Sequence, residues 1–215
     1  VTKPVPSILR EFSAPVLLDR KAPASERAFL LAHDTDPFNK WEAGRALAKD
    51  VMAEVALKGV PVSTAWLDAL AAVVFDDSLD PAFRALCLRL PAEDDLAQTI
   101  HGLGRVPDPA EIHFARREMT GALANRLGDG LERLYHKLDD RSVAYSPESG
   151  QAGRRALRIA ALGLLSRRDG GKLAADAYAN ARSMTEEFGA LMALLDVRQG
   201  QAELAACAAR WCKDA

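Results

Sequence analysis

The chain of 215 residues is long enough for one substantial helical domain, or for one domain and a fragment of another. Its 49% hydrophobic and 27% charged residues exclude a disordered chain, and a net charge of −2 excludes a strong general attraction to nucleic acid or anionic lipid. No apolar run approaches the ~20 residues that span a bilayer, and no signal-peptide pattern opens the chain, so we expect no membrane partner.

The first nineteen residues differ from the rest, because Pro4, Pro6 and Pro15 exclude a long helix there. We expect an extended segment whose apolar side chains need a partner surface; they are Ile8, Phe12, Val16, Leu17 and Leu18. The segment either belongs to a preceding β-rich region or lies against the first helices. The chain opens on Val1 rather than on methionine, which we interpret as a piece cut from a longer chain, a processed N-terminus being the alternative.

Helix starts are legible, because aspartate caps free amides and proline fits the first helical position. This pair stands at Asp36-Pro37, Asp80-Pro81 and Asp108-Pro109, and further starts are expected at Ser63, Ser146-Pro147 and Thr185. Glycines at 59, 104 and 170–171 are plausible stops. Together with the apolar spacing, these signals predict helices over residues 26–33, 37–58, 64–75, 81–89, 93–102, 109–138, 148–168, 172–182, 185–197 and 201–213.

The longest predicted helix, 109–138, carries apolar residues at steps of three or four. This stripe consists of Ile112, Ala115, Met119, Leu123, Leu127, Leu131, Leu134 and Leu138. Glycines at 121, 128 and 130 predict a bend or a division near residue 128. Residues 139–147 are expected to form a long surface loop.

Most connections between the predicted helices are short, so consecutive helices should pack as antiparallel hairpins. We therefore predict an all-α fold over residues 20–215, an irregular α-solenoid of stacked hairpins like those of HEAT or armadillo repeats. A short extended segment, residues 1–19, precedes it. No strict sequence repeat is present, so a simple bundle is the alternative.

The histidines do not have the spacing of a zinc hydrolase, which needs two imidazoles on one helix face and a carboxylate base. The four are His33, His101, His113 and His136; none is followed by glutamate, and no two stand three to five residues apart. Nucleophile-elbow and phosphate-loop motifs are also missing from the sequence. We therefore expect no catalytic, substrate-binding or metal-binding residue in this chain.

Two kinds of charge cluster were candidates for a site. Glu93, Asp94 and Asp95 could be metal ligands, but they open a predicted helix, where acids complement the dipole, and this reading is favoured. A basic helix carries Arg154, Arg155, Arg158, Arg167 and Arg168. A nucleic-acid interface would use such a face, yet no aromatic residues interleave with these arginines, so a solvated or domain-facing surface is favoured.

The cysteines and tryptophans are expected to be structural. An odd count of three cysteines, Cys87, Cys207 and Cys212, argues against a secreted disulfide scaffold. We expect three buried thiols in a reducing compartment and therefore a cytoplasmic protein. The tryptophans lie on apolar helix faces and are expected in the core, with an exposed substrate platform as the alternative; they are Trp41, Trp66 and Trp211.

Two stretches are specific enough to indicate a family. Residues 4–16 read PVPSILREFSAPV and residues 36–48 read DPFNKWEAGRALA. Both resemble the bacterial aminopeptidase N family of gluzincin-type zinc metallopeptidases, at the junction between its small β domain and its C-terminal helical domain. The resemblance implies that residues 1–19 are a tail from the preceding β-sandwich and that residues 20–215 are the first part of the helical domain, incomplete at Ala215.

The resemblance also implies a function. The family's zinc motif, its exopeptidase motif and its oxyanion tyrosine precede the matched region, so no catalytic residue is carried over. In the parent enzyme, zinc in another domain would remove N-terminal residues from peptides. This chain, inactive alone, would shape and restrict access to that site, with the other domains of the polypeptide and peptide substrates as its partners. The alternatives are a free-standing helical-repeat scaffold for protein binding and a nucleic-acid-binding helical protein.

Overall fold

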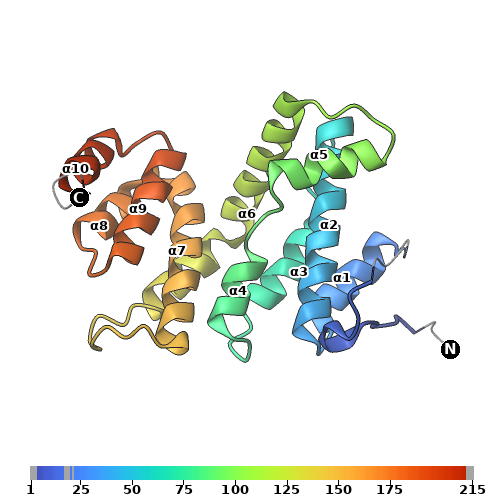
Figure 1. Cartoon of the computed structure of the whole chain (residues 1–215), viewed down its shortest axis with the longest axis horizontal. Coiled ribbons are helices and arrows are strands. Elements are labelled where there is room, and N and C mark those ends of the chain that lie inside the picture. The colour runs from blue at the N-terminus through green and yellow to red at the C-terminus, as the bar shows by residue number, and fades with distance from the viewer. Residues whose placement is uncertain (1–3, 17–19, 21, 212–215) are drawn as a thin grey trace. The chain divides into compact units, whose positions relative to one another are not determined.

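The computed structural model describes residues 4–16, 20 and 22–211, and every regular element in this part of the chain is a helix (Figure 1). The prediction of an all-α fold is therefore confirmed. The chain divides into two compact units, Val1–Ala122 and Leu123–Ala215, and the division falls within one long helix. Leu17, Leu18 and Cys212, singled out from the sequence, lie outside the described residues.

The first unit begins with an N-terminal arm, residues 4–16, that contains a single short 3₁₀ turn. The elements of this unit are η1 (Arg10–Phe12), α1 (Ala24–His33), α2 (Pro37–Lys58), α3 (Thr64–Val74), α4 (Pro81–Cys87), α5 (Glu93–Gly102) and the first part of α6 (Pro109–Lys137). Helix α2 packs against α1, α3, α4 and α5 and also against the arm. The long helix α2 is therefore the centre of this unit.

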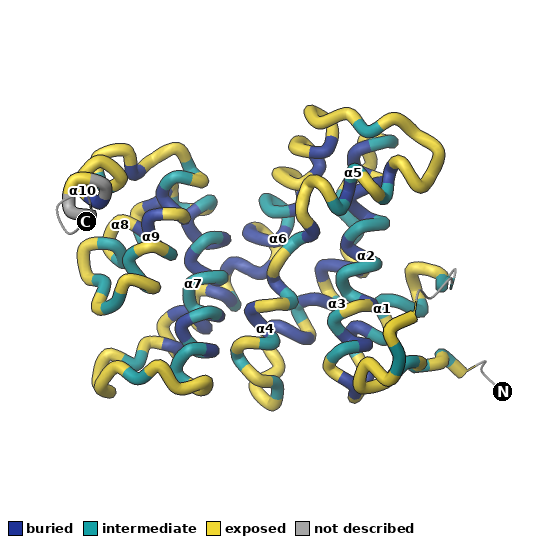
Figure 2. The backbone as a smooth tube through the Cα atoms, in the orientation of Figure 1, coloured by how far each residue is buried: buried dark blue, intermediate teal, exposed yellow. Residues whose placement is uncertain are grey.

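The core of the first unit forms where these helices meet. Its most completely buried large side chains are Leu31, Met52, Trp66, Val73, Leu96, Ile100 and Met119. In Figure 2, buried and exposed positions alternate along α5, which turns one face to the core, whereas α2 is coloured mostly as buried or intermediate, as expected for the central helix. Trp66 is buried as predicted, whereas Trp41 is only half-buried and the side chain of Trp211 is not described.

The second unit contains the rest of α6 and four further helices. These are α7 (Ser149–Asp169), α8 (Lys172–Ala179), α9 (Met184–Asp196) and α10 (Gln201–Trp211). Helix α9 packs against α7, α8 and α10, so it is central here. Leu131, Leu157, Ala161, Ala174 and Leu191 are among the buried residues that these helices contribute.

The apolar stripe predicted for α6 is confirmed, because all eight of its residues are buried. The predicted division near Gly128 is wrong: α6 runs without interruption from Pro109 to Lys137. A Cβ at position 128 would overlap the guanidinium of Arg168, so this glycine makes room for a neighbouring side chain rather than a break. No helix in the described ranges is both long and apolar enough to cross a bilayer.

The helix starts follow the caps expected from the sequence. Asp36 accepts from the N–H of Asn39, and Asp80 accepts from the N–H groups of Ala82 and Phe83. Two starts are shifted: Ser183, not Thr185, caps α9, and α7 begins at Ser149 after Glu148 rather than at Pro147. Gly59 and Gly170 end their helices in the left-handed conformation, as predicted.

Candidate functional site

The four histidines are exposed and lie on three helices: His33 on α1, His101 on α5, and His113 and His136 on α6. His113 is within 2.9 Å of Glu93, which links α5 to α6 on the surface. Within residues 4–16, 20 and 22–211, no group of three or more potential metal ligands comes together. The side chains described here therefore do not fit a zinc site.

The acidic cluster at the start of α5 serves the helix and its neighbour. Both carboxylate oxygens of Asp95 accept from the guanidinium of Arg45 at 2.6 Å, which ties α5 to α2. Asp95 also accepts from the N–H of Ala92, the residue that precedes the helix. The hydrogen bond from Arg45 lowers the pKa of Asp95, so the carboxylate stays ionised. This arrangement agrees with the helix-start interpretation.

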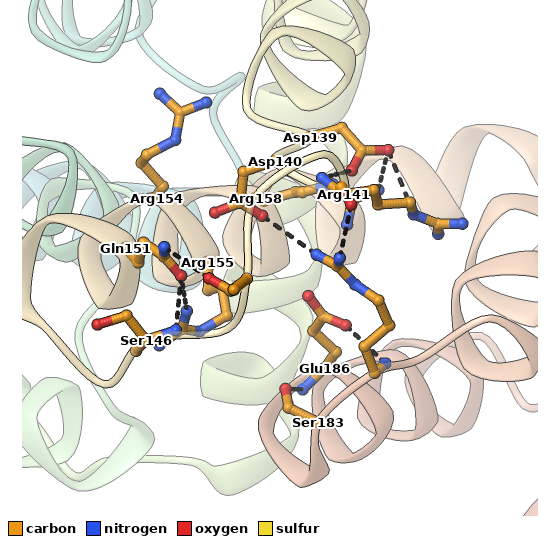
Figure 3. A network of polar contacts seen from close by, with 12 residues as sticks. Asp139, Asp140, Arg141, Ser146, Gln151, Arg154, Arg155, Arg158, Ser183 and Glu186 are labelled. Carbon is orange, nitrogen blue, oxygen red and sulfur yellow. Dashed lines mark hydrogen bonds and ion pairs between the residues drawn. The ribbon is translucent and has the colours of Figure 1, made fainter.

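The basic helix α7 and the loop before it form a network of polar contacts, which Figure 3 shows from close by. The loop between α6 and α7 consists of residues 138–148, and the sequence predicted a surface loop over residues 139–147. Arg155 is only 7% exposed, although a solvated or domain-facing position was favoured. Arg155 is buried because the loop before α7 folds over it and supplies hydrogen-bond acceptors for its guanidinium.

Arg155 holds the end of the loop against α7. Its guanidinium donates to the carbonyl oxygen of Ser146 at 3.0 Å and to Gln151 at 3.3 Å, and it lies 4.7 Å from the ring centre of Tyr145. Gln151 in turn donates to the carbonyl oxygen of Ala144 and accepts from the N–H of Ser146. A planar guanidinium suits such a site because it combines several donors with stacking.

The other arginines of α7 are also bound within the second unit. Arg158 lies 4.3 Å from the ring centre of Tyr135 and pairs with Asp139 at 3.3 Å. Arg154 donates to the carbonyl oxygen of Lys137. Arg167 pairs with Asp196, and Arg168 pairs with Asp129. These contacts occupy the basic face that a phosphate backbone would need, and the expectation of no nucleic-acid partner stays a prediction.

The N-terminal arm is fastened to the start of α2 by a second polar cluster, which we call the arm clasp: Ser7, Arg10, Glu11, Asp34, Asp36 and Asn39. Arg10 donates to Asp34 at 3.1 Å, and the backbone N–H of Glu11 donates to Asp36 at 2.9 Å. Asn39 donates to the hydroxyl of Ser7 at 2.9 Å. The arm therefore lies against the first helices, which was one of the two expectations.

The arm clasp offsets an unfavourable backbone. Leu9, Glu11 and Phe12 have φ angles of 56°, 57° and 52°, a left-handed conformation that costs side-chain-bearing residues on the order of 1–3 kcal/mol each. Phe12 packs edge-on against Phe38 with ring centres 5.0 Å apart, yet remains 57% exposed. An apolar groove of about 450 Å³ runs between the arm and helices α1 and α2, lined in part by Ile8, Phe12, Leu30 and Phe38.

Two buried cations were not anticipated from the sequence. The ammonium of Lys40 donates to the carbonyl oxygens of Leu31 and Ala32 at 3.1 and 2.9 Å, at the end of α1. Arg84 donates to the carbonyl oxygen of Val74 at 2.7 Å, at the end of α3. Burial lowers the pKa of the Lys40 ammonium. Such a cation leaves no periodic signal in the sequence, because its partner carbonyls belong to a different helix.

The described thiols are structural, with one difference from expectation. Cys207 is buried, as predicted, whereas Cys87 is only partly so. Burial nevertheless raises the pKa of the Cys87 thiol to about 11, which keeps it protonated and unreactive.

The sequence of residues 24–215 matches the family described as "Domain of unknown function (DUF3458_C) ARM repeats". Among curated proteins, the chain is 40% identical over 201 residues to the aminopeptidase N of Caulobacter vibrioides, covering 92% of the chain and 22% of that protein. It is 33% identical over 199 residues to the aminopeptidase N of Escherichia coli, covering 89% of the chain and 22% of that protein. The chain thus spans about a fifth of the length of these relatives.

A solved structure has the same fold. The crystal structure of Legionella pneumophila aminopeptidase A in complex with aspartic acid matches with a TM-score of 0.78 and 24% sequence identity. The match covers 95% of this chain and 25% of that one. The likeness confirms the helical architecture over nearly the whole chain.

Proposed function

The chain belongs to the DUF3458_C family of ARM-repeat domains, and we propose that it serves as a non-catalytic helical domain of a zinc aminopeptidase. In that parent enzyme it shapes the entrance to the active site and restricts which peptides reach it. The observation that carries the proposal is the identity with the aminopeptidase N of Caulobacter vibrioides over most of the chain.

The architecture suits this role physically. Stacked helical hairpins expose long surfaces without requiring reactive groups, and their shape follows from how each hairpin packs on the next. The charged clusters singled out in the sequence connect segments of the chain. Arg155 and Arg158 bind the loop before α7, and Asp95 binds Arg45 and so links α5 to α2. Such a framework can present a wall to a substrate channel and keep its form while peptides pass.

Zinc and the hydrolytic step are assigned to another part of the parent polypeptide. Zinc supplies a bound water of lowered pKa and polarises the scissile carbonyl. The exposed, separate histidines of this chain offer no ligand set, so no step of the reaction is derived from its residues. We propose a cytoplasmic enzyme whose remaining domains and peptide substrates are the partners of this chain.

The proposal is tested on the Caulobacter vibrioides relative, intact and with the segment that matches residues 24–215 deleted. Both forms are assayed on an aminoacyl anilide and on peptides of increasing length up to an unfolded protein. We expect the deletion to keep anilide hydrolysis and to reduce discrimination against long substrates by at least about tenfold. Unchanged discrimination, or loss of anilide hydrolysis as well, contradicts an access role.

A further inference from the structure

The N-terminal arm, residues 4–16, is held on the first unit mainly by polar contacts. None of the residues 4–16 is buried, and its largest apolar side chain, that of Phe12, remains 57% exposed. Beyond the arm clasp, the guanidinium of Arg20 donates to the carbonyl oxygen of Pro6 at 3.0 Å. Burial of apolar surface is the main source of folding stability, so a segment that buries this little is weakly attached.

The backbone of the arm opposes its own attachment. Leu9, Glu11 and Phe12 lie in the left-handed region, which side-chain-bearing residues disfavour because of their Cβ. No glycine stands among residues 4–16 to relieve the strain. A detached arm would be free to return to ordinary backbone conformations. The strain therefore favours detachment, and the hydrogen bonds of the arm clasp oppose it.

The receiving side of the arm clasp has contacts of its own that do not involve the arm. Oδ1 of Asp36 accepts from the N–H of Asn39 at 2.8 Å and so caps α2, and Oδ1 of Asp34 accepts from the N–H of Asp36 at 2.9 Å. These hydrogen bonds lie entirely within residues 34–39. The turn between α1 and α2 can therefore keep its form when the arm leaves.

Arg10 supplies the ionic part of the attachment. Its guanidinium donates to Oδ1 of Asp34 at 3.1 Å and to the hydroxyl of Thr35 at 2.8 Å. The side chain of Arg10 is 48% exposed, whereas that of Asp34 is 1% exposed. An ion pair with one solvent-exposed partner is weakened by salt, so ionic strength acts on the closed state of the arm.

We infer that the arm is a strap that opens and closes on the first unit while the helices of that unit stay folded. Two opposing terms set its balance, the backbone strain and the arm clasp, and a change in either one shifts the population of the open state. The inference goes beyond the proposed function and does not depend on it, because it uses only contacts within the first unit.

The test is amide hydrogen exchange of the full chain, resolved by residue with NMR. The N–H of Glu11 donates to Asp36 only when the arm is closed, whereas Met52 lies in the core of α2. We expect the Glu11 amide to be protected and yet to have a protection factor at least about a hundredfold below that of Met52. Raising sodium chloride from about 0.05 M to about 1 M should lower the protection of Glu11 at least about twofold and change that of Met52 less.

Two glycine variants test the strain, and neither removes a backbone N–H. Glu11 has a φ of 57° and Ser13 a φ of −61°, and both side chains are exposed. Glu11→Gly relieves a left-handed residue and should raise the protection of the amide at position 11 about three- to tenfold. Ser13→Gly relieves nothing and adds freedom to the open arm, so it should lower that protection about two- to threefold.

Each alternative outcome overturns the inference. Equal protection of Glu11 and Met52 means that the arm opens only when the whole unit unfolds. An unprotected Glu11 amide means that the arm is not attached. Lower protection in both glycine variants means that no strain is stored at position 11, and protection of Glu11 that does not respond to salt means that the ion pair does not hold the strap.

Discussion

The backbone N–H of Glu11 donates a 2.9 Å hydrogen bond to Oδ2 of Asp36, while Oδ1 of the same carboxylate caps α2 through the N–H of Asn39. One side chain therefore starts a helix and holds the arm. The two stretches of sequence that resemble the aminopeptidase N family, residues 4–16 and 36–48, meet at this contact.

Replacing Asp36 by alanine should destabilise the first unit more than the loss of a helix cap alone. The cap contributes about 1 kcal/mol, and the Glu11 hydrogen bond to a charged acceptor contributes about 1.5–3 kcal/mol. Asp80→Ala is the control, because Asp80 caps α4 from the same Asp-Pro pair and its hydrogen bonds go to Ala82 and Phe83 of that helix. Urea unfolding measures both variants, and equal losses for the two would contradict a role for Asp36 in holding the arm.

Stability should fall in acid partly through Asp36. Hydrogen bonds led by that from the N–H of Asn39 lower the pKa of this carboxyl below its usual 3.8. A carboxyl whose folded-state pKa is depressed stabilises the fold above its unfolded pKa and loses that contribution as pH falls through the folded value. We therefore expect the free energy of unfolding to fall less between about pH 4 and pH 2 in Asp36→Asn than in the wild type. Parallel pH profiles would show that Asp36 does not carry this dependence.

Two glycines in the second unit should respond to alanine with opposite signs. A Cβ at Gly189 of α9 would lie 2.7 Å from Cγ2 of Ile159 on α7, and this methyl is fixed by a stiff, β-branched side chain. We expect Gly189→Ala to cost about 1–3 kcal/mol by overpacking, offset in part by better helix propensity. At Gly163 of α7 a Cβ would meet nothing within 4 Å, so Gly163→Ala should stabilise by up to about 1 kcal/mol. Thermal unfolding of both variants measures the two changes in stability. A Gly189→Ala variant more stable than the wild type would mean that α7 and α9 are not closely packed at Gly189 and Ile159.

Arg155→Lys should loosen the loop before α7 although the charge is retained. Lysine cannot reproduce the paired contacts to Ser146 and Gln151 or the planar stacking on Tyr145, so we expect a loss of about 1–2 kcal/mol. Faster amide hydrogen exchange in residues 139–148 is the measured signature. Arg154→Lys is the control at the neighbouring position: Arg154 donates to the carbonyl oxygen of Lys137, outside the segment from residue 139 to 148, so the change should alter amide exchange little. Equal exchange in the two variants would show that the loop does not depend on Arg155.

The helices could be predicted from sequence because their signals are local. The Asp-Pro caps, the glycine stops and the stripe from Ile112 to Leu138 each act within a few turns of chain, and the observed bounds differ from the predicted ones by no more than three residues in the described part. The prediction that α6 divides near Gly128 was wrong because it considered only the low helix propensity of glycine. Its space is needed by Arg168, which lies forty residues further along the chain.

Contacts between one helix and the segment before it could not be predicted in the same way. The burial of Lys40 depends on carbonyl groups at the end of α1, and the burial of Arg155 depends on how the preceding loop returns over α7. No sequence pattern pointed to Arg182, yet this residue binds the loop before α7 through Asp140 and the carbonyl oxygen of Arg141. The arginines at helical spacing on α7 predicted an exposed basic surface. The structure shows that the loop before α7 covers Arg155, which is part of that surface.

The central claim is that this chain provides framework and no reaction centre. Its most direct test is the hydrolysis of L-alanine 4-nitroanilide by the purified chain in the presence of added zinc. We predict a rate equal to that of zinc in buffer alone. Saturable hydrolysis that requires the folded chain and is abolished by a chelator would contradict the account.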